Sequence, residues 1–238
     1  MILKVHKASD RGNADFGWLK ANFSFSFGNY FNAERINFGA LRVLNDDYIK
    51  GGMGFGTHPH NNMEIVTIPL KGSLKHKDSM SNKWIPLEVG EVQVMSAGSG
   101  IQHSEMNNNA EEELNLFQIW ILPNQENLEP RYDQKAFSVS NRANKLQKLV
   151  SWIKDSDDDS LKIHQDARIS RIDLSKKNNY NYVLKNKNYG VYLMLIEGEI
   201  LVNNVVLNKR DALEIEQAKQ FEIEAIKHSE ILFIEVPM

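Results

Sequence analysis

Short apolar runs alternate with polar turns along most of the chain. Each run has about four to eight residues and ends at Gly, Asn, Asp or Pro, which favour turns. Runs of this length and spacing are typical of strands in a β-sandwich or β-barrel, and long stretches with helical periodicity are scarce. We therefore predict an all-β protein, in which residues 142–152 are the best, though weak, helix candidate. The clearest strand candidates are 41-LRVL-44, 64-EIVTIPL-70, 92-VQVM-95, 116-LFQIWIL-122, 191-VYLMLI-196, 200-ILVNNVVL-207 and 231-ILFIEV-236.

The two halves of the chain repeat one pattern. In IVTIPLKGSL (65–74) and in VYLMLIEGEIL (191–201), a strand is followed by a charged residue, a glycine and a second strand. A further strand and a polar turn follow each of them. This repetition predicts two copies of one β-barrel unit, joined through the loop-like segment 123–134. We expect an N-terminal barrel in residues 1–135 and a C-terminal barrel in residues 136–238.

Composition and charge narrow the possible functions. The chain has 238 residues, a net charge of −3 and no cysteine. A protein without cysteine has no disulfide, no thiolate metal site and no thiol nucleophile, so any metal must be held by His, Asp, Glu or backbone oxygen. The small negative charge argues against nucleic-acid binding, which needs clustered Lys and Arg.

The polarity of the first residues and the hydropathy of the chain bear on its cellular location. The first sixteen residues are too polar for a signal peptide, and no apolar run approaches the roughly 20 residues that a membrane helix needs. We expect a cytoplasmic protein without a membrane partner. We also expect a monomer, because two fused barrels already cover much of each other.

Two histidine motifs are the candidate chemistry. His58 and His60 stand one residue apart after a glycine-rich run, and His103 and Glu105 repeat this spacing after a second glycine-rich turn. Side chains at positions i and i+2 of a strand point to the same side, so each pair can converge on one ion. Pro59 removes one ladder hydrogen bond, which favours an edge strand or a strand start. A lone His-x-His pair occurs by chance, but two matched pairs favour a metal site on neighbouring strands.

A second carboxylate competes for the same role. Glu64 has the same parity as His58 and His60, so it could face the ion in place of Glu105. The spacing alone does not decide between them.

The sequence resembles the pirin family of the cupin superfamily, and most of all the short bacterial pirins with quercetinase activity. The resemblance is carried by GALRVLNDD (39–47), HPHNNMEIVT (58–67), LKHKDSMSN (74–82) and VMSAGSGIQHSE (94–105). It is continuous from about residue 10 to about residue 135 and thinner beyond. The two cupin motifs are matched by Gly52, His58, His60 and Glu64, and by Gly100, His103 and Asn107.

The family implies a bicupin, in which two jelly-roll-like barrels pack face to face and only the N-terminal barrel holds a metal. The resemblance implies that His58, His60, His103 and Glu105 are the metal ligands, so it favours Glu105 over Glu64 as the carboxylate ligand. Glu64 is then a candidate for contacting a ligand side chain without binding the metal itself. The C-terminal half lacks both motifs, so we expect it to hold no metal. Substrate contacts are not assigned.

Three imidazoles and one carboxylate suit Fe(II) best, and Mn, Co, Ni, Cu or Zn also fit the ligand types. An octahedral ion with four protein ligands has two open positions, as a dioxygenase requires. The resemblance implies 2,3-dioxygenation of a flavonol such as quercetin with release of carbon monoxide, in which Glu105 is the general base. A competing hypothesis is an iron- or redox-sensing regulator that binds a transcription factor or a metabolic enzyme without turnover.

Overall fold

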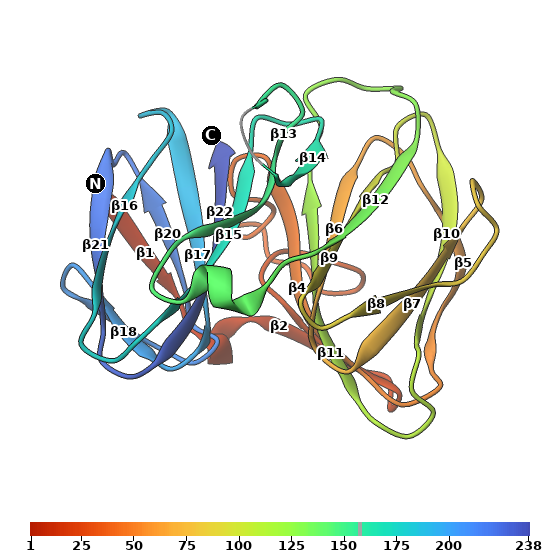
Figure 1. Cartoon of the computed structure of the whole chain (residues 1–238), viewed down its shortest axis with the longest axis horizontal. Helices are drawn as coiled ribbons and strands as arrows, with labels where there is room; N and C mark the ends of the chain where they lie inside the picture. Colours follow the sequence, from red (N-terminus) through yellow and green to blue (C-terminus); the bar gives the residue numbers. More distant parts are fainter. Residues whose placement is uncertain (157–158) are drawn as a thin grey trace.

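The computed structural model describes residues 1–156 and 159–238, and it consists of two β-lobes that stand side by side (Figure 1). Each lobe is a large sheet closed against a smaller one, and the described residues contain helix only as two short 3₁₀ turns, η1 (Ala8–Asp10) and η2 (Val139–Arg142). The all-β, two-barrel prediction is therefore confirmed. No helix among the described residues is long and apolar enough to span a membrane.

The N-terminal lobe contains both histidine motifs. Its large sheet has the order β12-β9-β6-β11-β4-β3-β2, and its small sheet has the order β5-β10-β7-β8. The strands are β2 (Gly12–Asp15), β3 (Leu19–Phe23), β4 (Leu41–Ile49), β5 (Gly54–His60), β6 (Glu64–Lys71), β7 (Ser73–Asp78), β8 (Ile85–Glu88), β9 (Glu91–Ser96), β10 (Ile101–Asn107), β11 (Leu114–Ile121) and β12 (Arg131–Ala136).

The C-terminal lobe repeats this topology. Its sheets have the orders β1-β20-β17-β22-β15-β13-β14 and β16-β21-β18-β19, so β17, β20 and β22 stand where β6, β9 and β11 stand in the first lobe. The strands are β1 (Ile2–His6), β13 (Gln147–Trp152), β14 (Leu161–Ile163), β15 (Arg168–Leu174), β16 (Asn179–Val183), β17 (Tyr189–Glu197), β18 (Glu199–Val202), β19 (Val205–Asn208), β20 (Ala212–Glu216), β21 (Gln220–Ala225) and β22 (Ser229–Pro237).

The glycines of the sequence repeat make equivalent turns. Gly72 joins β6 to β7 with a φ of 78°, and Gly198 joins β17 to β18 with a φ of 100°. L-residues with side chains avoid this region of φ. At Gly198 a Cβ would also lie 2.3 Å from the carbonyl oxygen of His228, so the turn has no room for a side chain.

The two lobes exchange their first strands. β1 precedes the strands of the N-terminal lobe in the chain, but it pairs with β20 of the C-terminal lobe. β12 precedes the strands of the C-terminal lobe, but it pairs with β9 of the N-terminal lobe. Figure 1 shows β1, in red, among the blue strands. The proposed division at residue 135 thus does not describe β1, which belongs by pairing to the second lobe.

Four clusters of buried apolar side chains among the described residues stabilise the molecule. One lies between the two large sheets and takes side chains from both, such as Phe117 and Ile119 on β11 and Met194 on β17, which gives the face-to-face packing. A second fills the whole interior of the C-terminal lobe. The interior of the N-terminal lobe holds two smaller clusters instead, because polar side chains occupy the space between them.

The helix candidate at residues 142–152 is wrong. η2 ends at Arg142, and β13 begins at Gln147. Leu149 and Val150 are buried between the lobes, and β13 pairs with both β14 and β15. Tertiary pairing therefore overrides a weak local helical pattern.

Candidate metal centre

The strand pair β5 and β10 brings three histidines together. His58 lies directly opposite His103 in the ladder, and His60 lies on the same side of β5 as His58. The ring centroids of His58 and His103 are 4.3 Å apart. The ring centroid of His60 lies 4.9 Å from that of His58 and 4.8 Å from that of His103. Of the two alternatives that Pro59 left open, the structure has the edge strand, because β5 stands at the edge of its sheet.

Gly54 lets β5 approach β10 closely. A Cβ at Gly54 would lie 2.2 Å from the carbonyl oxygen of Glu105. At this point a bulge between His103 and Glu105 shifts the register of β10 against β5. Bulges of this kind re-aim side chains next to functional sites. The glycine-rich run before His58 is thus partly explained by packing.

The three imidazoles have the properties of metal ligands. Their available nitrogens all lie within 4.8 Å of one another, and neither ring nitrogen of His103 has a hydrogen-bond partner among the described residues. His58 donates from Nδ1 to the carbonyl oxygen of Gly56 at 2.8 Å, which leaves Nε2 free to coordinate. The three residues therefore fit a divalent ion.

Burial keeps two of these rings neutral. Desolvation lowers the pKa of His60 to about 4, with His58 contributing, and it lowers the pKa of His103 to about 4 despite the opposing effect of Glu105. A neutral imidazole is the form that binds metal, so protons do not compete for these ligands at neutral pH.

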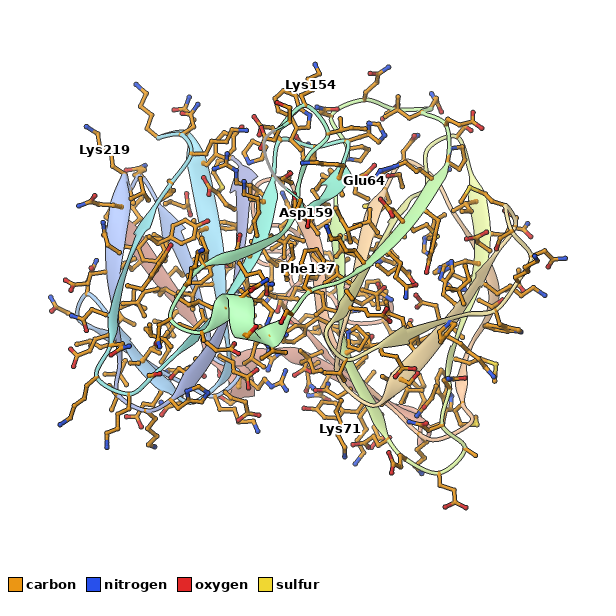
Figure 2. The ribbon with its side chains drawn as sticks, viewed as in Figure 1. Glu64, Lys71, Phe137, Lys154, Asp159 and Lys219 are labelled. Carbon is orange, nitrogen blue, oxygen red and sulfur yellow. The ribbon has the colours of Figure 1, made fainter. Side chains whose placement is uncertain are left out.

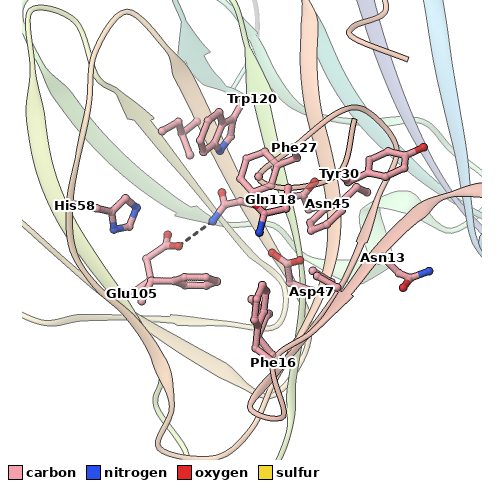
Figure 3. Close-up of a pocket in the computed structure, with 18 of the residues that line it drawn as sticks. Asn13, Phe16, Phe27, Tyr30, Asn45, Asp47, His58, Glu105, Gln118 and Trp120 are labelled. Atoms are coloured by element: carbon pink, nitrogen blue, oxygen red, sulfur yellow. Dashed lines mark hydrogen bonds between the residues drawn. The ribbon is translucent and has the colours of Figure 1, made fainter. Parts of the chain in front are cut away.

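Glu105 lies beside this trio but faces two other groups. It forms a second possible ligand group with His76 and His103, so His103 is common to both groups. Its Oε2 accepts a 2.8 Å hydrogen bond from Nε2 of Gln118, whereas Oε1 has no hydrogen-bond partner (Figure 3). Burial opposes ionisation of Glu105, but the favourable interactions with His76, whose Nδ1 lies 3.8 Å from Oε1, and with His103 hold the pKa of Glu105 below its usual value.

A chain of hydrogen bonds behind Gln118 orients its amide. Thr67 donates to Oε1 of Gln118 at 3.1 Å and lies 3.5 Å from Nε2 of Gln93, all inside the barrel. Because Oε1 accepts from Thr67, the NH₂ group of Gln118 must face Glu105. The large sheet thereby holds a carboxylate that belongs to the small sheet.

His76 and Asp78 are functional candidates that sequence reasoning missed. Nε2 of His76 lies 3.2 Å from Oδ2 of Asp78, and its Nδ1 lies 3.8 Å from Oε1 of Glu105. The ring also stacks on Tyr132 at 4.8 Å. A signal was present, because His76 and Asp78 have the same i, i+2 spacing as His103 and Glu105.

Glu64 is the candidate that the structure does not bring to the cluster. It opens β6, its Oε2 accepts a 2.7 Å hydrogen bond from Ser96, and its neighbours include His164 and Arg131. The parity count fails because Asn62, with a φ of 46°, turns the chain between β5 and β6. Burial raises the pKa of Glu64, and Ile65 lines the pocket instead.

A pocket of about 550 Å³ opens beside the three histidines (Figure 3). That volume is within the usual range for small-molecule sites. Trp120 packs edge-on against His60 at 4.9 Å and against Phe27 at 5.3 Å. Six aromatic side chains contribute to the wall, namely Phe16, Phe23, Phe27, Tyr30, Phe55 and Trp120. A flat aromatic ligand suits such a wall.

The equivalent positions of the C-terminal lobe are filled by apolar and aromatic side chains. Strand β21 stands in the place of β10, and it buries Phe221 and Ile223 where β10 buries His103 and Glu105. Tyr182 of β16 stacks on Phe221 at 5.1 Å. Among the residues that the structure describes, both candidate ligand groups lie in the N-terminal lobe.

Comparisons with known proteins agree with this architecture. Residues 4–121 match the family model described as Pirin, and residues 149–236 match the model described as Quercetinase C-terminal cupin domain. The chain is 40% identical over 236 residues to a protein named quercetin 2,3-dioxygenase from Escherichia coli K12, with 99% of each chain covered. It is also 40% identical over 224 residues to a pirin-like protein of Caulobacter vibrioides, with 94% of this chain and 95% of the relative covered.

A solved structure has the same fold over nearly the full length. It is described as the bacterial pirin YhhW from Escherichia coli in complex with nickel(II), and it superposes with a TM-score of 0.92 at 38% identity, covering 99% of both chains.

Proposed function

Since the chain belongs to the pirin family, as its identity to full-length relatives shows, we propose that it is a metal-dependent dioxygenase that cleaves a flavonol such as quercetin. The proposal is supported by one arrangement above all. His58, His60 and His103 gather at the wall of an aromatic pocket, with Glu105 alongside.

We assign His58, His60, His103 and Glu105 as the ligands. The ligand types exclude a thiolate site and fit Fe(II), as well as Mn, Co, Ni, Cu and Zn. The nickel(II) complex of the E. coli pirin supports metal binding by this fold and leaves the metal of this chain open. When bound, the ion would supply Lewis acidity and a fixed template for the substrate and O₂.

The protein side chains would orient the substrate and move one proton. Aromatic walls at Phe27 and Trp120 would hold the flat rings of the flavonol and exclude water. Glu105 would accept the proton of the 3-hydroxyl group, which raises the electron density of the ring that reacts with O₂. The hydrogen bond from Gln118 leaves Oε1 as the free oxygen for that proton.

The overall reaction is balanced without a further reductant. Both atoms of O₂ enter the product, two carbon–carbon bonds of the central ring break, and the carbon that carried the 3-hydroxyl group leaves as carbon monoxide. The remaining ester is a depside. The flavonol is the electron donor and O₂ is the oxidant.

Metal analysis and loss of flavonol absorbance under O₂ test the proposal together. The parent protein is expected to contain about one metal ion per chain and to consume one O₂ per quercetin. His58→Ala and Glu105→Ala should lose turnover, whereas His228→Ala, at an exposed position far from the motifs, should keep it. Turnover at the parental rate by metal-free His58→Ala would refute the enzymatic assignment.

The regulatory alternative predicts a different result. A redox sensor would bind its protein partner in one oxidation state of the metal and consume no O₂ with any flavonol. The pocket with aromatic side chains next to the histidines favours turnover of a small molecule.

A further inference from the structure

Two side chains on the pocket wall carry oxygen atoms without a hydrogen-bond donor. They are Asn45 and Asp47 on β4, which are 2% and 4% exposed, and Oδ1 of each has no partner among the described residues. Both residues line the pocket. A buried polar atom without a partner costs free energy, so two such atoms in one wall indicate a site for a ligand that carries hydrogen-bond donors.

The strand register places these oxygens across the barrel from the histidines. Asn45 and Asp47 are an i, i+2 pair of the large sheet, so both point to the same side. Asn45 lies opposite Gln118 in the ladder between β4 and β11, and Gln118 reaches Glu105. Figure 3 shows Asn45, Asp47 and Gln118 extending into the part of the pocket that Glu105 faces.

The chemistry of Asp47 favours a neutral donor over a cation. Within the part of the chain that the structure describes, no Lys, Arg or His forms an ion pair with Asp47, whereas Arg11 and Arg210 pair with the neighbouring Asp46. Burial raises the pKa of Asp47 well above its usual value, and the charges of Asp46 and Glu105 raise it further. A protonated carboxyl group both donates and accepts, which matches a hydroxyl group.

We propose that Asn45 and Asp47 form a specificity subsite for a hydroxyl group on the part of an aromatic substrate that lies away from the three histidines. This subsite rests on the proposed function, because that function places the ring with the 3-hydroxyl group at the three histidines. Quercetin, which carries hydroxyl groups on its outer rings, would pair with these oxygens. The otherwise identical 3-hydroxyflavone has only the 3-hydroxyl group and would leave them unpaired.

Anaerobic binding separates the two ligands without any turnover. Tryptophan fluorescence quenching under nitrogen gives the dissociation constants of quercetin and 3-hydroxyflavone for the nickel(II)-loaded protein. The parent protein is expected to prefer quercetin by at least about tenfold. Asp47→Leu and Asn45→Leu should each weaken quercetin about fivefold and leave 3-hydroxyflavone unchanged, since each removes one ordinary hydrogen bond.

Conservative and distant variants complete the test. Asp47→Asn keeps a hydrogen-bonding group and should keep the preference for quercetin, and Asn181→Leu, on an exposed strand of the other lobe, should bind both flavonols as the parent does. Thermal melting verifies that each variant is folded. If Asp47→Leu does not fold, the binding measurements on Asn45→Leu decide the test.

Two outcomes would overturn the subsite. One is equal affinity of the parent protein for both flavonols, and the other is a loss by the Leu variants that is the same for both. Absence of turnover in air would overturn the proposed function alone, because the binding measurements need no oxygen.

Discussion

Gln118 on β11 donates a 2.8 Å hydrogen bond to Glu105 on β10, and this contact joins the two sheets of the N-terminal lobe inside the barrel. It determines which oxygen of the carboxylate is free. The residue that we assign as the general base is thus oriented from the opposite wall.

Replacing Gln118 should separate catalysis from binding. Gln118→Met keeps the volume and removes the donor, which costs about 1.5–3 kcal/mol for a hydrogen bond to a charged group. We expect kcat for quercetin to fall by roughly one to two orders of magnitude while the metal content and KM change little. The control Gln125→Met lies at an exposed loop position and should behave as the parent. A fall in metal content equal to the fall in kcat would show that Gln118 acts through folding.

Metal removal should destabilise the protein through the histidines. A metal that binds only the folded state stabilises it by about 2.7 kcal/mol at 100 times its Kd. We expect chelation to lower the thermal midpoint of the parent, and nickel(II) to restore it. His103→Ala should show no such response, whereas His228→Ala should respond as the parent does. A full nickel response in His103→Ala would remove His103 from the ligand set.

The two glycines of β5 should tolerate alanine very differently. A Cβ at Gly54 would meet the carbonyl oxygen of Glu105, so Gly54→Ala must push β5 away from β10. We expect it to lose about 1–3 kcal/mol of stability, the usual cost of overpacking, together with metal affinity. Gly56 has open space at the same point, so Gly56→Ala is the matched control and should keep both. Denaturant unfolding and metal titration compare the two variants, and equal effects would refute the close-approach explanation.

Acidification should destabilise the metal-free protein partly through His6. This residue on β1 lies 3.1 Å from the hydroxyl group of Tyr192, and burial lowers its pKa to about 4, with Arg35 and Arg11 contributing. Below pH 6.5 the unfolded chain takes up a proton at this histidine, but the folded chain does so only near pH 4. Stability therefore falls between pH 6.5 and 4, by at most about 3.4 kcal/mol from this group at 1.36 kcal/mol per pKa unit.

The variant His6→Gln removes this proton uptake. Denaturant unfolding across the same pH range is expected to show a smaller loss of stability than in the parent, whatever its stability at pH 7. An identical pH dependence in both proteins would contradict the burial of a neutral His6.

Local patterns were enough for the strand-borne parts of the site. Side chains alternate along a strand with a period of two, so His58 with His60, and His103 with Glu105, could be paired from the sequence. Pro59 indicated an edge strand or a strand start, of which the structure has the edge strand, and the charged residue before Gly72 and Gly198 indicated the repeated hairpin. His76 with Asp78 obeys the same rule, although its role depends on Glu105 facing it.

The failures lie where a turn or a long-range contact intervenes. Counting residues from His60 to Glu64 assumes one continuous strand, and the turn at Asn62 breaks that assumption. The helix candidate at 142–152 became a strand because β14 and β15 supplied pairing partners. The exchange of β1 and β12 depends on contacts between lobes that no local pattern contains.

The amino-acid sequence by itself determined the all-β class, the internal repeat and the residue types available to a metal, since strand periodicity and turn chemistry are properties of neighbouring residues. Only the tertiary structure decided that Gln118, Asn45 and Asp47 face Glu105 across a pocket, because closing a barrel joins side chains more than ten residues apart through side-chain hydrogen bonds and packing.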